Sequence, residues 1–234
     1  MYGKQEIKIK RIYFLHGFMG TAETHFVHQV ESLKDNYELI LIDLPGHGNA
    51  TVEASENYFE ETLCYVISQM KEFGKGYIVG LSLGASVAIH IALNKPNLVS
   101  GVVLTGYSPF VPDELKDVME KQYDYFINIE KNDRHIAEHF KKLHGEKWNN
   151  TLRKVLHTMT FYYPTVSEKQ IKDIKVPVLI LNGSNDVHEV ESATYVKKVK
   201  GEIKIGLVPD AGHTANIDQP LIYNLILENF IKEN

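Results

Sequence analysis

A single serine stands between two glycines at a point where the character of the chain changes. Residues 77–94 read YIVGLSLGASVAIHIALN, so that Ser82 is flanked by Gly80 and Gly84. The apolar stretch before the serine is typical of a buried strand, and the stretch after it has helical periodicity up to Pro96. Such a G-x-S-x-G motif is typical of a nucleophilic serine on a sharp strand-to-helix turn. The alternative is that the small residues only allow close packing of strand and helix.

A nucleophilic serine needs a base and an acid that orients the base. Asp186 follows an apolar segment at residues 176–182, and His213 follows another at residues 202–208. Both residues therefore come just after the carboxyl ends of predicted strands, where open α/β sheets build their sites. The chain order of serine, acid and histidine is the one found in doubly wound hydrolases. We predict that Ser82 attacks, that His213 takes its proton, and that Asp186 orients His213.

Three other carboxylates could take the place of Asp186, namely Asp210, Glu189 and Asp173. Asp210 stands only three residues before His213, which favours a role in shaping the turn. The position at a strand end and the chain order favour Asp186 over the others.

An acyl-transfer site also needs hydrogen-bond donors for the oxyanion. Leu83 would begin the helix after the serine, and its backbone N–H is one candidate donor. The second candidate is the N–H of Phe18 in the segment HGFMG at residues 16–20, which follows an early apolar segment. The alternative for this segment is a plain turn at the end of a strand.

The pattern of strands and helices around these residues predicts an α/β fold with a doubly wound, mostly parallel sheet. Short apolar segments alternate with helical patterns, and we expect the α/β core to comprise residues 1–107 and 176–234. Residues 108–175 have no strong strand pattern and are expected to form a helical cap inserted over the sheet. Residues 4–10 alternate isoleucine with charge and predict an exposed edge strand. Other predicted strands cover residues 11–15, 38–43, 77–81, 100–105, 176–182 and 202–208.

Composition excludes several classes of protein. The 234 residues fit one domain, and a net charge of −5 argues against a nucleic-acid partner. A single cysteine, Cys64, is expected in the core and fits a reducing compartment. The first residues lack the apolar region of a signal peptide, and no apolar run has the length of a membrane span. We therefore expect a cytoplasmic protein with a small-molecule substrate, and oligomeric state is not predicted.

Two further motifs could indicate a cofactor or a metal. Gly74 and Gly76 precede a predicted strand, whereas a dinucleotide loop follows one. The segment HIAEH at residues 135–139 matches a zinc-binding pattern but has no clear third ligand. A solvated helix face explains it better, and we expect neither a metal nor a cofactor.

Five segments in order resemble landmarks of the α/β-hydrolase superfamily: FLHGFMG, LIDLPGHGNA, VGLSLGASVAI, LNGSNDVH and PDAGHTANIDQP. The resemblance implies Ser82 as nucleophile, Asp186 as acid and His213 as base, with the N–H groups of Phe18 and Leu83 as the oxyanion hole. It also implies that residues 108–175 form a helical cap.

A closer resemblance links LHGFMG and DLPGHG to the menaquinone-pathway lyase group of this superfamily. Those proteins usually carry an arginine four residues after the nucleophile to bind substrate carboxylates, where this chain has Ser86. We therefore expect a carboxylesterase-like serine hydrolase that cleaves esters or thioesters of an apolar acyl group through an acyl-enzyme. The alternatives are a lyase or C–C hydrolase of this fold, and a receptor that retains the triad with little turnover.

Overall fold

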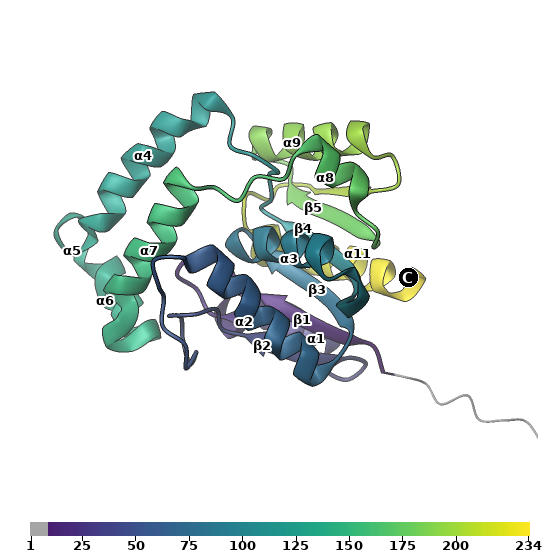
Figure 1. Cartoon of the computed structure of the whole chain (residues 1–234), viewed down its shortest axis with the longest axis horizontal. Coiled ribbons are helices and arrows are strands. Elements are labelled where there is room, and N and C mark those ends of the chain that lie inside the picture. Colours follow the sequence, from purple (N-terminus) through teal and green to yellow (C-terminus); the bar gives the residue numbers. More distant parts are fainter. Residues whose placement is uncertain (1–8) are drawn as a thin grey trace, which may run out of the picture.

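The computed structural model describes residues 9–234, and these form a six-stranded sheet in which all neighbouring strands are parallel (Figure 1). The predicted α/β fold with a doubly wound parallel sheet is confirmed. The predicted strand at residues 4–10 falls mainly outside the described residues, and residues 9 and 10 are not in a strand. The strands, in spatial order, are β2 (Glu38–Ile42), β1 (Arg11–Leu15), β3 (Gly76–Leu81), β4 (Val99–Thr105), β5 (Val178–Gly183) and β6 (Lys204–Val208).

Helices cover both faces of the sheet, which explains why its inner strands are largely apolar. In β3 and β5 every residue is buried, whereas the edge strands β2 and β6 are partly exposed. Alternate strand residues point to opposite faces. In β1, Tyr13 and Leu15 belong to the core cluster on the face covered by α2 (Tyr58–Phe73), α3 (Leu83–Asn94) and α9 (Val187–Val199). Ile12 and Phe14 pack on the other face with α1 (Ala22–Leu33), α10 (Ala215–Asp218) and α11 (Pro220–Glu233).

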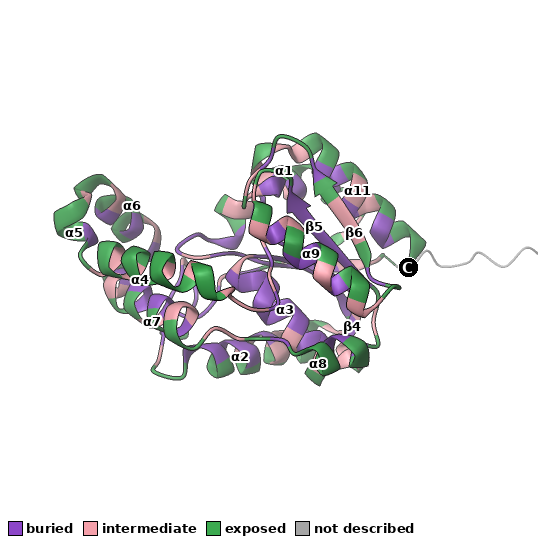
Figure 2. Ribbon diagram, turned by 90° about the horizontal axis from the view of Figure 1, so that it is seen from above, coloured by how far each residue is buried: buried purple, intermediate pink, exposed green. Residues whose placement is uncertain are grey.

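A group of helices between β4 and β5 projects from the sheet to one side (Figures 1 and 2). We call residues 113–161 the inserted helices. Their small apolar core contains Phe140, Trp148 and Leu152, and Met19 from the loop after β1 also belongs to it. They comprise α4 (Asp113–Ile127), α5 (Ile129–Asn132), α6 (Arg134–His144) and α7 (Trp148–Phe161), with a 3-10 turn at Gly145–Lys147.

The end of the expected cap segment behaves differently. Helix α8 (Glu168–Asp173) buries Ile171, and Ile171 and Ile174 pack into the large core cluster under the sheet. The segment at residues 108–175 therefore divides into helices that stand away from the sheet and a final helix that packs beside α9 (Figure 1).

Buried hydrogen bonds attach the inserted helices to the loops that follow β1 and β2. The Nδ1 atom of His144 accepts from the N–H of Gly48 at 2.9 Å, and its Nε2 atom lies 3.1 Å from the carbonyl oxygen of Met19. The Thr151 hydroxyl donates to the Gly46 carbonyl at 3.0 Å. These contacts hold α6 and α7 over the edge of the sheet where the strands end.

Two further observations bear on the sequence-based expectations. Cys64 is exposed on α2, so the prediction that it lies in the core is wrong. No helix within residues 9–234 combines the length and apolarity needed to cross a membrane.

Candidate active site

Ser82 occupies a strained turn between β3 and α3. Its backbone angles are φ 56° and ψ −112°, a region that costs a non-glycine residue on the order of 1–3 kcal/mol. The flanking positions must be glycine, because neither has room for a Cβ. A Cβ at Gly80 would lie 2.4 Å from the Gly84 carbonyl oxygen, and a Cβ at Gly84 would lie 1.9 Å from the Leu15 carbonyl oxygen. The motif therefore lets the helix turn back tightly onto the sheet while holding one hydroxyl at its edge.

The Ser82 turn faces a cavity of about 600 Å³ between the edge of the sheet and the inserted helices. His213, Asp186 and Glu189 line the same cavity. Within the described part of the chain no hydrogen bond joins Ser82 to His213, and such contacts often tighten only when substrate is bound. The tertiary structure thus brings the predicted nucleophile, base and acid to one site.

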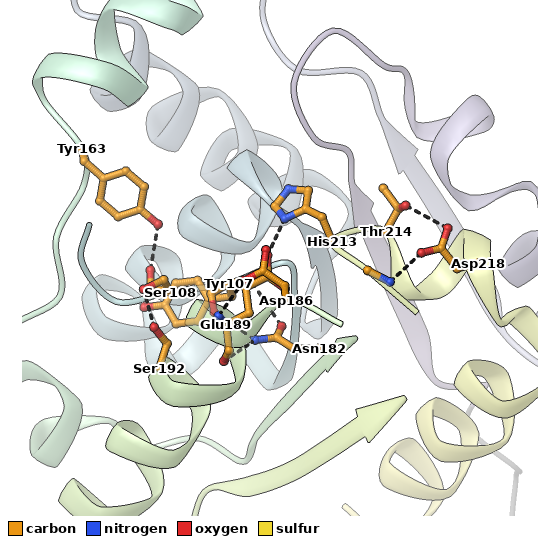
Figure 3. A network of polar contacts seen from close by, with 11 residues as sticks. Tyr107, Ser108, Tyr163, Asn182, Asp186, Glu189, Ser192, His213, Thr214 and Asp218 are labelled. Atoms are coloured by element: carbon orange, nitrogen blue, oxygen red, sulfur yellow. Dashed lines mark hydrogen bonds and ion pairs between the residues drawn. The ribbon is translucent and has the colours of Figure 1, made fainter. Parts of the chain in front are cut away.

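The acid that contacts His213 is Glu189, not Asp186 (Figure 3). The Nδ1 atom of His213 lies 2.5 Å from Oε1 of Glu189, whose side chain is 8% exposed. Asp186 instead caps helix α9, where its Oδ1 atom accepts from the N–H of Glu189 at 3.0 Å. The predicted contact between Asp186 and His213 is therefore corrected to Glu189. The reason is local, because the carboxylate of Asp186 accepts from the free N–H of Glu189 at the start of its own helix.

The charges around His213 favour its protonated form. Burial, the largest single cause, lowers the pKa of His213, but the hydrogen bond and charge of Glu189 together with the charges of Asp186 and Asp218 outweigh it. The net result is a raised pKa. A neutral His213 that donates from Nδ1 to Glu189 keeps Nε2 free to accept a proton. Asp186 thus acts on His213 through its charge and not through contact.

Glycines at the ends of β4 and β5 allow the His213 loop to approach. Gly106 has φ 59°, and a Cβ there would lie 2.8 Å from Cε1 of His213. A Cβ at Gly183 would lie 2.2 Å from the Ala211 carbonyl oxygen. Asp218 fixes the loop from the other side, since it accepts from the N–H of Gly212 at 2.8 Å and from the hydroxyl of Thr214 (Figure 3).

The loop after β1 presents the second predicted oxyanion donor. The Nε2 atom of His16 accepts from the N–H of Leu44 at 2.9 Å, so a neutral His16 carries its proton on Nδ1. That Nδ1 atom lies 2.8 Å from the Gly17 carbonyl oxygen and donates to it. In a trans peptide the next N–H, that of Phe18, points in the opposite direction. Within residues 9–234, the N–H groups of Phe18 and Leu83 have no hydrogen-bond partner.

The walls of the cavity are mostly apolar. Among the described residues, neither arginine nor lysine lines it. Ser86 is buried, and the hydroxyl of Tyr163, which lines the cavity, donates to the Ser108 carbonyl oxygen at 2.8 Å (Figure 3). The position at which the lyase group carries its arginine is therefore occupied by a small, neutral and buried residue. The apolar lining residues are Phe18, Leu81, Leu83, Phe110, Val111, Pro112, Leu115, Met119, Phe126, Leu156 and Met159.

The remaining candidates from the sequence lie elsewhere or have other contacts. Asp210 adopts a positive φ of 55° in the turn before His213, and Asp173 forms an ion pair with Lys169 on α8. In the HIAEH segment of α6, Glu138 pairs with Arg134 on an exposed surface.

Sequence reasoning missed His25, which lines the cavity from helix α1. Its Nδ1 atom accepts from the N–H of Gly17 at 3.1 Å. Burial, with a smaller contribution from the charges of His213 and His144, lowers the pKa of His25 to about 4. No motif in the sequence marks this residue, because the contact depends on how α1 packs against the loop after β1.

Comparisons with known proteins agree with this fold. The model of the alpha/beta hydrolase family matches residues 12–223. The chain is 27% identical to Protein PHYLLO, chloroplastic, of Arabidopsis thaliana over 93% of its own length, but it spans only 15% of that protein. It is 26% identical to a putative 2-succinyl-6-hydroxy-2,4-cyclohexadiene-1-carboxylate synthase of Bacillus subtilis, covering 93% of this chain and 88% of the relative.

A third relative is an esterase by name. The chain is 26% identical to the pimeloyl-[acyl-carrier protein] methyl ester esterase of Wigglesworthia glossinidia brevipalpis, covering 94% of this chain and 93% of that protein. Among solved structures, NosK from Streptomyces actuosus matches with a TM-score of 0.89 and 31% identity, over 97% of this chain and 99% of that one. The chain therefore belongs to the alpha/beta hydrolase family.

Proposed function

We propose that this protein is a serine hydrolase that cleaves carboxylic esters or thioesters through an acyl-enzyme. The observation that carries the proposal is the shared cavity of Ser82, held on a strained turn, and His213, hydrogen-bonded to Glu189. Ser82 is the nucleophile, His213 the base and Glu189 the orienting acid. The last assignment replaces Asp186, which supplies negative charge nearby.

The reaction proceeds in two halves. The Ser82 hydroxyl attacks the substrate carbonyl while Nε2 of His213 takes its proton, and the N–H groups of Phe18 and Leu83 stabilise the oxyanion. The tetrahedral intermediate expels the alcohol or thiol, which leaves with the proton from His213. Water then attacks the acyl-Ser82 ester, again giving its proton to His213, and the carboxylic acid is released as Ser82 regains its proton.

The cavity wall supports a neutral, apolar acyl group as the substrate. A carboxylate brought into this wall would lose its hydration without meeting a lysine or arginine among the described residues. This weighs against the lyase alternative suggested by the carboxylate in the name of the Bacillus subtilis relative. Ser86, a buried neutral residue, supplies no positive charge to replace the missing arginine. The name of the Wigglesworthia relative supports ester cleavage.

An active-site phosphonate tests the proposal directly. A fluorophosphonate probe should label the wild-type protein on Ser82, and Ser82→Ala should lose both labelling and p-nitrophenyl ester turnover. Ser68→Ala is the matched control, since Ser68 lies on α2 with its hydroxyl bonded to the Tyr65 carbonyl. Folded wild-type protein that is not labelled would contradict the proposal. Labelling without turnover on esters and thioesters would favour the receptor or lyase alternative.

A further inference from the structure

The loop that carries the Phe18 N–H is held at two points by histidine rings. His16 donates to the carbonyl oxygen of Gly17, and the ring of His25 accepts from the N–H of the same residue at 3.1 Å. Both polar backbone groups of Gly17 are therefore bonded to side chains. Since the peptide planes on either side of Gly17 share its two torsions, these bonds restrict the direction of the Phe18 N–H.

Gly17 lies directly against the nucleophile. A Cβ placed on Gly17 would be 3.2 Å from the Cβ of Ser82 and 3.3 Å from the Leu81 carbonyl oxygen. A small rotation of this loop would therefore change the position of the Phe18 N–H relative to Ser82. Displacing one oxyanion donor is costly, because its removal typically lowers kcat by about 10²–10³-fold.

Helix α1 is irregular next to His25, and the backbone of His25 is bonded to a side chain outside the helix. Phe26 has non-helical angles, φ −124° and ψ 19°. The carbonyl oxygen of His25 accepts from the side-chain amide of Asn216 at 2.6 Å. Gln29, one turn further along α1, donates to the carbonyl oxygen of Asn216 at 3.0 Å. Asn216 follows His213 by three residues, so α1 is bonded to the loop of the base as well as to the oxyanion loop.

The protonation state of His25 fits this role. An acceptor at Nδ1 must be unprotonated there, and burial keeps the pKa of His25 at about 4. A neutral His25 therefore carries its proton on Nε2 and remains an acceptor for Gly17 at neutral pH.

We infer that His25 is a positioning residue that holds the Gly17–Phe18 loop so that the Phe18 N–H faces Ser82. The inference rests on the proposed function and extends it to a residue outside the triad. His25 acts through Gly17, and it is the acceptor atom, not the size of the ring, that matters.

Two substitutions distinguish the effect of the Nδ1 acceptor of His25 from the effect of the size of its ring. In His25→Asn the amide oxygen can take the place of Nδ1, whereas His25→Phe keeps a ring without an acceptor. We expect His25→Phe to lower kcat for p-nitrophenyl butyrate by about 10–100-fold with KM changed little, while His25→Asn keeps most of the activity. His28→Phe is the matched control, because His28 is exposed on the same helix.

Amide hydrogen exchange gives a readout that does not depend on turnover. The Gly17 N–H should exchange about tenfold faster or more in His25→Phe, but not in His25→Asn or His28→Phe. Equal kcat in wild type and His25→Phe, or equal losses in His25→Asn and His25→Phe, would overturn the role of His25. A wild-type protein that fluorophosphonate fails to label would instead overturn the proposed function, and the exchange rates would still show whether His25 holds the loop.

Discussion

His213 and Glu189 are joined by a hydrogen bond of 2.5 Å between Nδ1 and Oε1. Glu189 stands on the first turn of α9, three residues after the aspartate that caps this helix. The longer glutamate side chain spans from the helix to the histidine, and its second oxygen, Oε2, is buried without a hydrogen-bond partner among the described residues. The cap and the histidine partner are therefore two different carboxylates.

Exchange of these two carboxylates for amides distinguishes their roles. Glu189→Gln should lower kcat by about 10²–10⁴-fold, because an amide does not stabilise the imidazolium that forms during attack. Asp186→Asn should retain most of the activity, since asparagine also caps helices well and His213 keeps its partner. Steady-state kinetics on one ester measures both. A larger loss in Asp186→Asn than in Glu189→Gln would restore Asp186 as the acid.

The pH dependence of kcat/KM should reflect the raised pKa of His213. His213 must be neutral to accept a proton, so activity should rise with pH through a midpoint above the ordinary histidine value of about 6.5. Glu189→Gln removes the negative charge beside His213 and so should lower the pKa of His213. The residual activity of this variant should therefore persist to lower pH than the activity of the wild type. Asp186→Asn should shift the midpoint in the same direction by less. A midpoint that is unmoved in Glu189→Gln would show that another group titrates.

Gly106 should tolerate no side chain. A Cβ there would meet the His213 ring, and the positive φ adds strain for alanine. We expect Gly106→Ala to lower kcat by displacing His213, with loss of thermal stability measured by circular dichroism. Gly201→Ala is the control, since nothing lies within 4 Å of a Cβ at that exposed position. Wild-type kcat in Gly106→Ala would mean that the loop carrying His213 can shift to make room for the methyl group without loss of activity.

The cavity should prefer neutral acyl chains. We expect the p-nitrophenyl ester of hexanoic acid to be cleaved with kcat/KM at least about tenfold above that of the adipic acid monoester, because the second carboxylate loses hydration without a partner. Met119→Lys places a cation in the lining and should narrow this ratio. Val118→Lys is the matched control, because Val118 is exposed on the same helix. Equal rates for both esters in wild type would contradict this assignment.

Buried histidines should make the fold sensitive to acid. The rings of His16 and His47 lie 4.7 Å apart, and burial lowers the pKa of His16 to about 4 and that of His47 well below its ordinary value. Below about pH 6.5 the unfolded chain binds protons that the folded chain excludes, so each such histidine costs about 1.4 kcal/mol of stability per pH unit. Urea unfolding between pH 7 and 5 should show this loss, and His47→Phe should reduce its slope. An unchanged slope would mean that His47 is protonated in the folded state.

Local patterns in the sequence were enough to predict the sheet, the order of its strands along the chain and the turn at Ser82. Each strand and helix is predicted by the pattern of apolar residues within its own short segment. The two glycines around Ser82 indicate a place where two parts of the backbone approach too closely for a Cβ. The positions of His213 and of the Phe18 loop just after predicted strands extended this to the base and to the second oxyanion donor, and the family resemblance implies the same residues. The prediction for Cys64 failed because one cysteine in an amphipathic helix can fall on either face, and here it faces outward.

The sequence alone determined which residue could be the nucleophile, because the strand, the sharp turn and the helix around Ser82 are encoded within about twenty adjacent residues. Only the tertiary structure decided which carboxylate meets His213 and that His25 bonds to Gly17. Those contacts depend on how helices α9 and α1 begin and pack against loops distant in the chain. Asp186 caps the start of α9, so Glu189, three residues further along the chain, is the carboxylate that reaches His213. Residue spacing alone does not show which of two carboxylates one helical turn apart faces the histidine.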